Sequence, residues 1–183
     1  MKKRVVYVNG SFVDEDKAKV SVFDRGFLFA DAVYEVTAVI DGKILEWDGH
    51  VKRLERSLKE LDMKFPISET ELLDIHFDLI KKNTLKEGLI YLQVSRGKDD
   101  RSFDYPDESV KPTLVLFTQV KSLSESNIAK TGLKVISVPD MRWGRRDIKT
   151  VQLLAPSMCK MMAKKKNKDC LLYTSDAADD GHS

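Results

Sequence analysis

The chain has 183 residues, of which 42% are hydrophobic and 33% are charged, and its formal net charge is +2. That length is enough for one ordinary domain with a buried core, plus part of a second. A near-neutral charge is not typical of a nucleic-acid-binding protein, and no apolar run approaches the roughly 18 residues of a membrane span. The first residues lack the apolar length of a signal peptide, so we expect a cytoplasmic protein.

Cysteine and histidine are too scarce for a metal or disulfide framework. The two cysteines, Cys159 and Cys170, cannot form one. The histidines His50, His76 and His182 do not combine with them in any zinc-binding spacing. We therefore expect no metal site.

Two hairpins are predicted near the N-terminus. Strands at 5–8 and 11–13 flank an Asn-Gly pair, and strands at 33–40 and 43–47 flank an Asp-Gly pair. These pairs favour tight turns in which both central residues take a positive φ. The first part of the chain therefore predicts an antiparallel sheet.

Two helices are predicted to follow. Asp48 can cap the first, and Ser68 with Glu71 three residues later forms a capping box for the second. Apolar residues recur at helical spacing in both. They are Val51, Leu54, Leu58 and Leu61 in the first helix, and Leu72, Ile75, Leu79 and Ile80 in the second.

Strands at 89–95 and 113–120 complete the predicted N-terminal domain, which spans residues 1–120. The fold class is α+β, with an antiparallel sheet and helices in two layers. The polar segment 121–131 is interpreted as an interdomain linker. A strand from 132 and a helix over about 151–166 indicate that a second domain begins within residues 132–169, too small to bury a core alone.

The last segment, residues 170–183, differs from the rest in composition. It reads CLLYTSDAADDGHS, which is rich in aspartate and has no periodicity after Tyr173. It resembles the translation of a transposon-end adapter used in sequencing libraries, and such a segment is excluded from fold reasoning. We expect the natural protein to be longer, while a genuine disordered tail is the alternative.

General motifs identify no chemistry in this chain. It has no glycine-rich phosphate loop and no serine hydrolase elbow. Arginine suits carboxylate and phosphate binding, but most of these side chains would by themselves be interpreted as solvated surface charges. Those in predicted loops or turns are Arg25, Arg96, Arg101, Arg142, Arg145 and Arg146, and Arg53 lies early in a helix.

Four motifs in order resemble the class IV pyridoxal-phosphate aminotransferases. They are DRGFLFADAVYEV (24–36), HVKRL (50–54), IYLQVSRG (90–97) and RRDIKTVQLL (145–154). The first and last look most like D-amino-acid aminotransferases. Branched-chain aminotransferases and aminodeoxychorismate lyases share parts of the pattern and remain alternatives within the family.

The resemblance implies pyridoxal 5′-phosphate as cofactor. Lys149 matches the lysine that binds it covalently and then carries a proton to and from the substrate, which requires an unprotonated amine. Arg53 matches the arginine that binds the cofactor phosphate. Tyr34 matches a tyrosine that lines the site, and Val36, two residues later on the same strand face, would line the side-chain pocket.

The resemblance also implies a substrate carboxylate ligand at Arg101. D-amino-acid aminotransferases pair this arginine with a histidine two residues later, partly across a dimer interface, but here that position is Phe103. Losing one partner weakens the hold on a carboxylate by about 1–3 kcal/mol. Ala30 and Ala32 stand where the family often has glycine, and we expect both to require negative φ.

The implied reaction moves an amino group between an amino acid, with a D-amino acid favoured, and a 2-oxo acid in a homodimer. The family's acidic partner of the cofactor ring lies beyond the matched motifs, so we expect these 183 residues alone not to transaminate at a useful rate. A non-catalytic interaction module is the alternative from another class. A nucleic-acid binder is disfavoured, because the lysine clusters at both ends are interpreted as solvated.

Overall fold

The computed structural model describes residues 3–125 and 128–174. They divide into two compact units, Met1–Ser124 with Asp147–Val151 and Glu125–Arg146 with Gln152–Ser183. Residues 147–151, expected in the second domain, join the first unit because their main chain pairs with a strand there.

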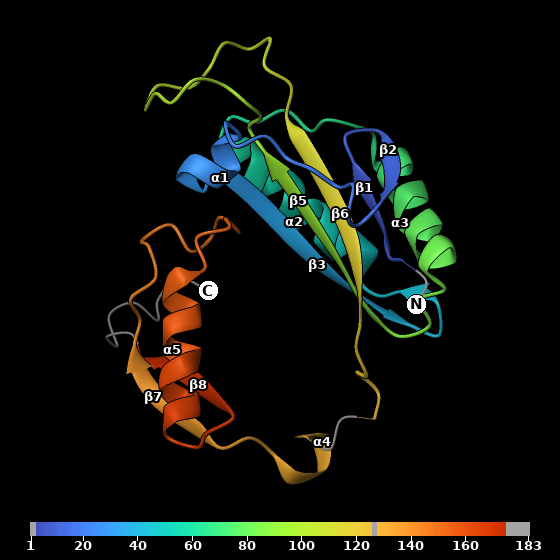
Figure 1. Cartoon of the computed structure of the whole chain (residues 1–183). Helices are drawn as coiled ribbons and strands as arrows, with labels where there is room; N and C mark the ends of the chain where they lie inside the picture. Colours follow the sequence, from blue (N-terminus) through green and yellow to red (C-terminus); the bar gives the residue numbers. More distant parts are fainter. Residues whose placement is uncertain (1–2, 126–127, 175–183) are drawn as a thin grey trace. The chain divides into compact units, whose positions relative to one another are not determined.

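The first unit is built on a six-stranded sheet in the order β2-β1-β6-β5-β3-β4, with antiparallel pairing between neighbours (Figure 1). Its strands are β1 (Val5–Val8), β2 (Ser11–Asp14), β3 (Ala32–Ile40), β4 (Lys43–Ile44), β5 (Gly88–Ser95) and β6 (Thr113–Val120). Both predicted hairpins are present. Asn9 and Asp41 take φ values of 45° and 50°, and the φ of the glycine after each is also positive. The turn chemistry therefore sets these two registers.

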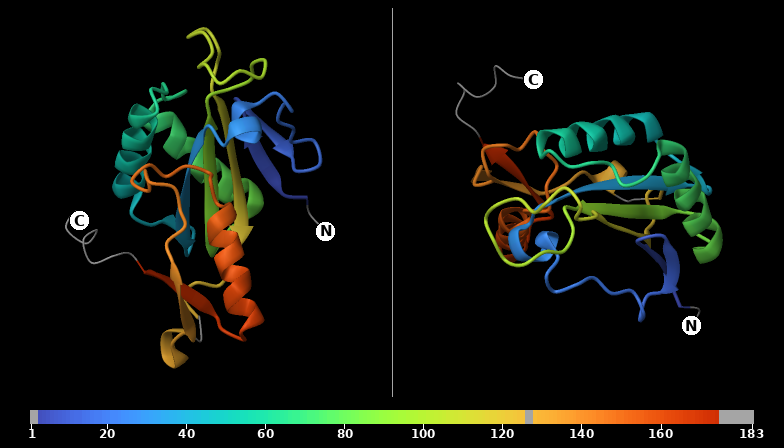
Figure 2. Two further views of the ribbon diagram at one scale, coloured as in Figure 1. Left: turned by 90° about the vertical axis from the view of Figure 1, so that its left-hand side faces the viewer. Right: turned by 90° about the horizontal axis from the view of Figure 1, so that it is seen from above.

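Three helices belong to this unit: α1 (Arg25–Phe29), α2 (Trp47–Glu60) and α3 (Glu69–Asn83). Both α2 and α3 cover the same face of the sheet (Figure 2). The capping box of α3 is confirmed at Ser68, which accepts a bond from the main chain of Glu71. The predicted Asp48 cap is wrong. The chain leaves β4 through a left-handed residue, Glu46, so that α2 begins two residues earlier and Asp48 falls in its first turn.

Strand alternation separates the two faces of the sheet. The face under the helices carries the core, while the opposite face is half-exposed. Glu35 lies on the helix face of β3, and Tyr34 and Val36 lie on the opposite, open face. The largest fully buried apolar side chains are Leu54, Leu58, Leu72, Leu79, Ile90, Leu92 and Leu116, with Val33, Val39 and Val94.

The expectation for Ala30 is wrong. Its φ is 55°, in the left-handed region, while Ala32 is the first residue of β3. Ala30 ends α1, and its main-chain N–H bonds the carbonyl of Arg25, a C-terminal cap that needs this conformation. Alanine accepts a cost of about 1–2 kcal/mol there because the cap directs the chain into β3.

The second unit contains α4 (Ile128–Thr131), α5 (Leu154–Lys165) and a parallel pair of strands, β7 (Val135–Pro139) and β8 (Cys170–Thr174). Helix α5 packs on both strands and buries Cys159 and Ala163. The start of the predicted adapter-like segment thus forms β8. Its remainder, residues 175–183, lies outside the described residues, and its origin stays a prediction. Within the described ranges, no helix is long and apolar enough to cross a membrane.

Candidate functional site

Residues 147–151 dock on one edge of β3. The main-chain N–H of Tyr34 bonds the carbonyl of Lys149 at 3.0 Å, and the N–H of Val151 bonds the carbonyl of Ala32 at 3.2 Å. Val33 and Thr150 form an antiparallel bridge between these bonds. The docking extends the sheet beside the first residues of β3, while β4 pairs with its last ones.

Lys149 is held against the ring of Tyr34. Its Nζ lies 4.2 Å from the ring centroid, a cation–π distance. Its main-chain N–H donates to the hydroxyl of Ser57 on α2 at 3.3 Å. The flanking residues Ile148 and Thr150 are buried, whereas Lys149 is half-buried. The lysine is therefore fixed at its backbone, while the residue as a whole stays partly exposed.

Arg53 and His50 on α2 converge on one buried carboxylate, Glu35. Arg53 donates from Nε and Nη2 to the two oxygens of Glu35 at 2.7 and 2.6 Å. Nδ1 of His50 lies 2.7 Å from Oε2. The side chain of Glu35 is 3% exposed and that of Arg53 is 45% exposed. The guanidinium thus bridges a buried acid and the surface.

Glu35 is held as a carboxylate. Burial opposes its charge, but the hydrogen bonds from Arg53 and His50 outweigh burial and leave the pKa of Glu35 below its usual value. Among the described residues, none accepts a bond from Nη1 of Arg53. Arg53 and Ser57 are four residues apart on one face of α2, so the guanidinium lies one helical turn from the residue that contacts Lys149.

Replacing Glu35 with glutamine tests this arrangement. We expect Glu35→Gln to lower the free energy of unfolding by about 1–3 kcal/mol, because His50 and Arg53 lose charged hydrogen bonds while the side chain keeps its shape. Urea unfolding measures the change. Glu15→Gln is the matched control, since its bridge to Arg4 has both side chains 43% exposed, and equal losses in the two variants would contradict the assignment.

An aromatic row crosses the open face from Tyr34. The rings of Tyr34 and Tyr91 stack with centroids 5.7 Å apart, and those of Tyr91 and Phe117 with centroids 4.9 Å apart. Tyr91 pairs in register with Val36 and donates its hydroxyl to Gln93. Burial, with a smaller contribution from Tyr34, raises the pKa of Tyr91 to about 12, so its hydroxyl stays protonated.

Several predicted site residues come together here. Lys149, Tyr34 and Arg53 lie on adjoining segments around the edge of β3, and Val36 shares the face of Tyr34. Arg101 lies apart from them. It is exposed on the loop between β5 and β6, and this loop extends beyond the end of the sheet (Figure 1). Its guanidinium lies over the rings of Phe29 and Phe103.

Sequence reasoning missed four residues of this neighbourhood: Glu35, His50, Tyr91 and Gln93. A signal existed for two of them. His50 and Arg53 are three residues apart in a helix and so share a face, and a glutamate on the neighbouring strand is their natural partner. The open-face role of Tyr91 and Gln93 depends on strand register, which a single sequence does not specify.

The donor set fits pyridoxal 5′-phosphate. Lys149 supplies an amine for the aldehyde, and Arg53 supplies a guanidinium edge for the phosphate. The ring of Tyr34 supplies an aromatic surface beside that amine. Within the described residues, no group of three or more histidine, cysteine, aspartate or glutamate side chains could hold a metal ion.

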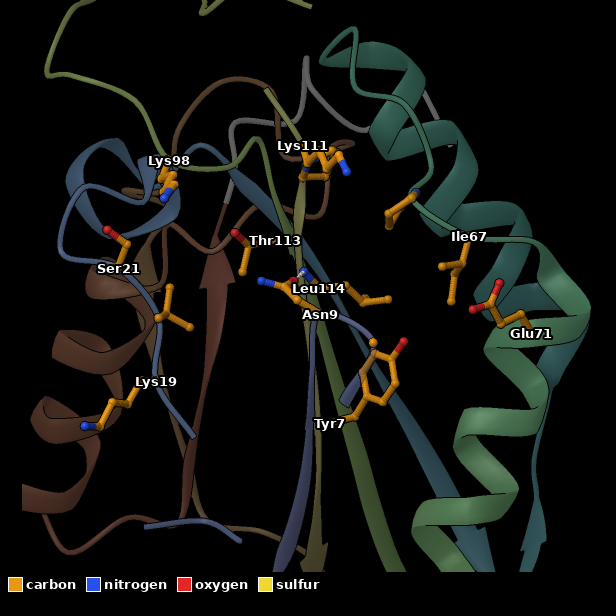
Figure 3. Close-up of a pocket in the computed structure, with 14 residues that line it drawn as sticks. Tyr7, Asn9, Lys19, Ser21, Ile67, Glu71, Lys98, Lys111, Thr113 and Leu114 are labelled. Carbon is orange, nitrogen blue, oxygen red and sulfur yellow. Dashed lines mark hydrogen bonds between the residues drawn. The ribbon is translucent and has the colours of Figure 1, made fainter. Parts of the chain in front are cut away.

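A pocket of about 730 Å³ lies elsewhere on the first unit (Figure 3). It is lined in part by Tyr7, Lys19, Lys98, Lys111 and Glu71, and by none of the predicted site residues. Its lysines are exposed. Volume alone therefore does not single out the predicted site residues, which lie around the edge of β3 and outside this pocket.

Comparison with known proteins matches residues 32–178 to the family described as Amino-transferase class IV. The D-alanine aminotransferase of Staphylococcus haemolyticus is 35% identical over 162 residues, covering 88% of this chain and 57% of the relative. That of Listeria monocytogenes serotype 4b is 34% identical over 164 residues, covering 88% and 56%. The chain thus spans less than two thirds of these relatives.

Solved structures share the fold. The branched-chain amino acid aminotransferase of Escherichia coli superposes with a TM-score of 0.80 at 18% identity, and the match covers 96% of this chain and 60% of that chain. A hypothetical aminotransferase from Mycobacterium tuberculosis, in its PLP-bound form, superposes with a TM-score of 0.78 at 17% identity. That match covers 94% of this chain and 62% of the other.

Proposed function

The chain belongs to the class IV aminotransferase family, and on that premise we propose that it serves a pyridoxal 5′-phosphate-dependent transamination between an amino acid and a 2-oxo acid. The observation that carries the proposal is the placement of Lys149, whose amine lies against Tyr34 while its main chain is bonded to β3 and α2. Catalytic nucleophiles need this combination of a fixed backbone and a free reactive atom.

The cofactor, when bound, supplies an electron sink for breaking the Cα–H bond of the substrate. Nζ of Lys149 accepts the Cα proton and later returns a proton, a role that requires the neutral amine. The backbone bonds of Lys149 limit the range of positions open to Nζ, so the proton moves along a defined direction.

Four further residues would bind the cofactor or the substrate. Nη1 of Arg53 holds the phosphate, while Glu35 fixes the other side of the guanidinium. The ring of Tyr34 limits where the cofactor ring can lie, and Val36 on the same face lines the pocket for the substrate side chain. Arg101 binds the substrate carboxylate. Within its own chain Arg101 lies away from the edge of β3, so in this role it would act across the homodimer that the family resemblance implies.

A D-amino acid is the favoured substrate, supported by relatives that are D-alanine aminotransferases. One observation favours a second candidate, a branched-chain L-amino acid: Phe103 stands beside Arg101 where a histidine is expected for the carboxylate. Transamination assays with D-alanine and L-leucine against a 2-oxo acid acceptor separate the two. Turnover of L-leucine alone would overturn the D-specific proposal.

Reductive trapping tests the proposal directly. The protein is incubated with pyridoxal 5′-phosphate, treated with borohydride and digested, and we expect the label on the peptide that contains Lys149. Lys149→Ala should abolish this label, because no other amine among the described residues lies against Tyr34, whereas Lys52→Ala, an exposed lysine on α2, should leave it unchanged. Labelling spread equally over the exposed lysines would contradict the proposal.

A further inference from the structure

Two buried arginines share one carboxylate at the base of the loop that carries Arg101. Arg25 and Arg96 are 3% and 8% exposed. Their Nε atoms donate to the same oxygen of Asp31, at 2.8 and 2.7 Å. Burying two positive charges against one negative charge is costly unless other acceptors complete the pairing, so their remaining bonds show what the cluster holds.

Those remaining bonds tie two segments together. Arg25 donates from Nη1 to the carbonyls of Ser102 and Asp104, at 2.8 and 3.2 Å. Arg96 donates from Nη2 to the carbonyl of Leu61 at 2.7 Å, just after the end of α2. One arginine therefore binds the loop on both sides of Phe103, and the other binds the body of the unit.

Aromatic rings complete the cluster. The ring of Tyr105 lies 3.7 Å from the guanidinium carbon of Arg96 and 5.9 Å from that of Arg25. Phe29 lies 4.6 Å from the guanidinium of Arg25 and 5.3 Å from that of Arg101. Arg101 thus rests on a ring that Arg25 also contacts, and its surroundings depend on the buried cluster.

The rest of the loop is largely exposed, and an exposed ion pair joins its Glu108 to Lys64, just after α2. A pocket of about 530 Å³ separates it from the end of α2, lined by residues 62–64, 96 and 105–112. Within residues 100–107 of this loop, the described structure shows hydrogen bonds between the loop's main chain and the rest of the unit only at the carbonyls of Ser102 and Asp104. Arg25 donates both of them. The position of Arg101 is therefore set mainly by the cluster.

We propose that Arg25, Arg96, Asp31 and Tyr105 form a clamp that fixes the loop of residues 98–112 and positions Arg101. Arg25 and Tyr105 are positioning residues, acting through Arg101 and not on the reacting atoms. The role of Arg101 toward a substrate carboxylate rests on the proposed function. The clamp itself is a statement about the loop, and it is tested without turnover.

Trypsin cleavage after Arg101 reports how often the loop opens, because exposed loops are cut in their open state. The rate at the Arg101–Ser102 bond is measured by mass spectrometry relative to cleavage after Lys19, an exposed lysine of the same unit outside the clamp. We expect Tyr105→Leu to raise this relative rate about fivefold, as for loss of a cation–π contact. Tyr105→Phe, which keeps the ring, should restore the wild-type rate.

Arg25→Lys keeps the charge beside Asp31 but cannot reach both carbonyls, and we expect it to raise the relative rate about tenfold. Because Arg25 is buried and Tyr105 is 58% exposed, the Tyr105 pair decides the question if the Arg25 variant fails to fold. Equal rates in Tyr105→Leu and Tyr105→Phe would overturn the clamp, whatever the cofactor does. Absence of cofactor label at Lys149 would overturn the proposed function and leave the clamp standing.

Discussion

Replacing Asp31 with asparagine is expected to lower the free energy of unfolding by about 3–5 kcal/mol, since it leaves buried arginines without their counter-charge. The side chain of Asp31 is 9% exposed and accepts from both Arg25 and Arg96. Asparagine keeps the size of the side chain, so the effect is one of charge and not of packing. Denaturant unfolding followed by circular dichroism measures it.

The control is Asp16→Asn. Asp16 pairs with Lys3, but the two side chains are 51% and 58% exposed, and we expect a change within about 0.5 kcal/mol. Added salt should reduce the small effect at Asp16 and leave the large one at Asp31 nearly unchanged. A loss below about 1 kcal/mol in Asp31→Asn would show that water solvates the two guanidinium groups and that the cluster is not a buried ionic unit.

Acid is expected to destabilise the first unit through His76. Burial lowers the pKa of this histidine to about 4 from its ordinary 6.5, and the bond from its Nδ1 to the carbonyl of Leu72 only partly offsets burial. The unfolded chain therefore binds a proton between pH 6.5 and pH 4 that the folded chain does not. The stabilisation that depends on the neutral His76 is fully present above pH 6.5. The free energy of unfolding falls by about 3 kcal/mol as the pH drops from there to about 4.

Comparison with His76→Leu isolates this contribution. The variant keeps an apolar side chain in the same position and removes the titration, so we expect a flatter dependence of unfolding free energy on pH. Glu35, whose pKa is lowered, also loses stabilisation in acid, and it does so in both proteins. The centroid of the His76 ring lies 4.9 Å from that of Trp47, whose fluorescence follows the transition. Parallel pH curves for the two proteins would contradict the prediction.

Local chemistry explains which elements could be predicted. The strands predicted at 89–95 and 113–120 are observed as Gly88–Ser95 and Thr113–Val120. They could be predicted because residues of each segment alternate between a buried and a half-exposed face of the sheet. Hairpin turns follow from two residue pairs that accept positive φ. The buried positions Leu54, Leu58 and Leu72 follow from helical spacing in the same way.

What could not be predicted depends on distant pairing. Nothing near Lys149 indicates that its main chain bonds Tyr34 and Ser57, because such contacts arise only when β3 and α2 have already packed. At Ala30 the prediction was wrong for a different reason. Alanine intrinsically prefers a negative φ, but the turn into β3 requires a positive one.

The docking of residues 147–151 also determines when Lys149 can reach its position against Tyr34. The strand that receives it is synthesised more than a hundred residues earlier, and closing so large a loop is slow and entropically costly. During synthesis the sheet and helices of the first unit can form while Lys149 is still absent, so Lys149 docks on a sheet that has already folded. A ligand that binds Lys149 and Arg53 together would then stabilise this last step of folding by mass action.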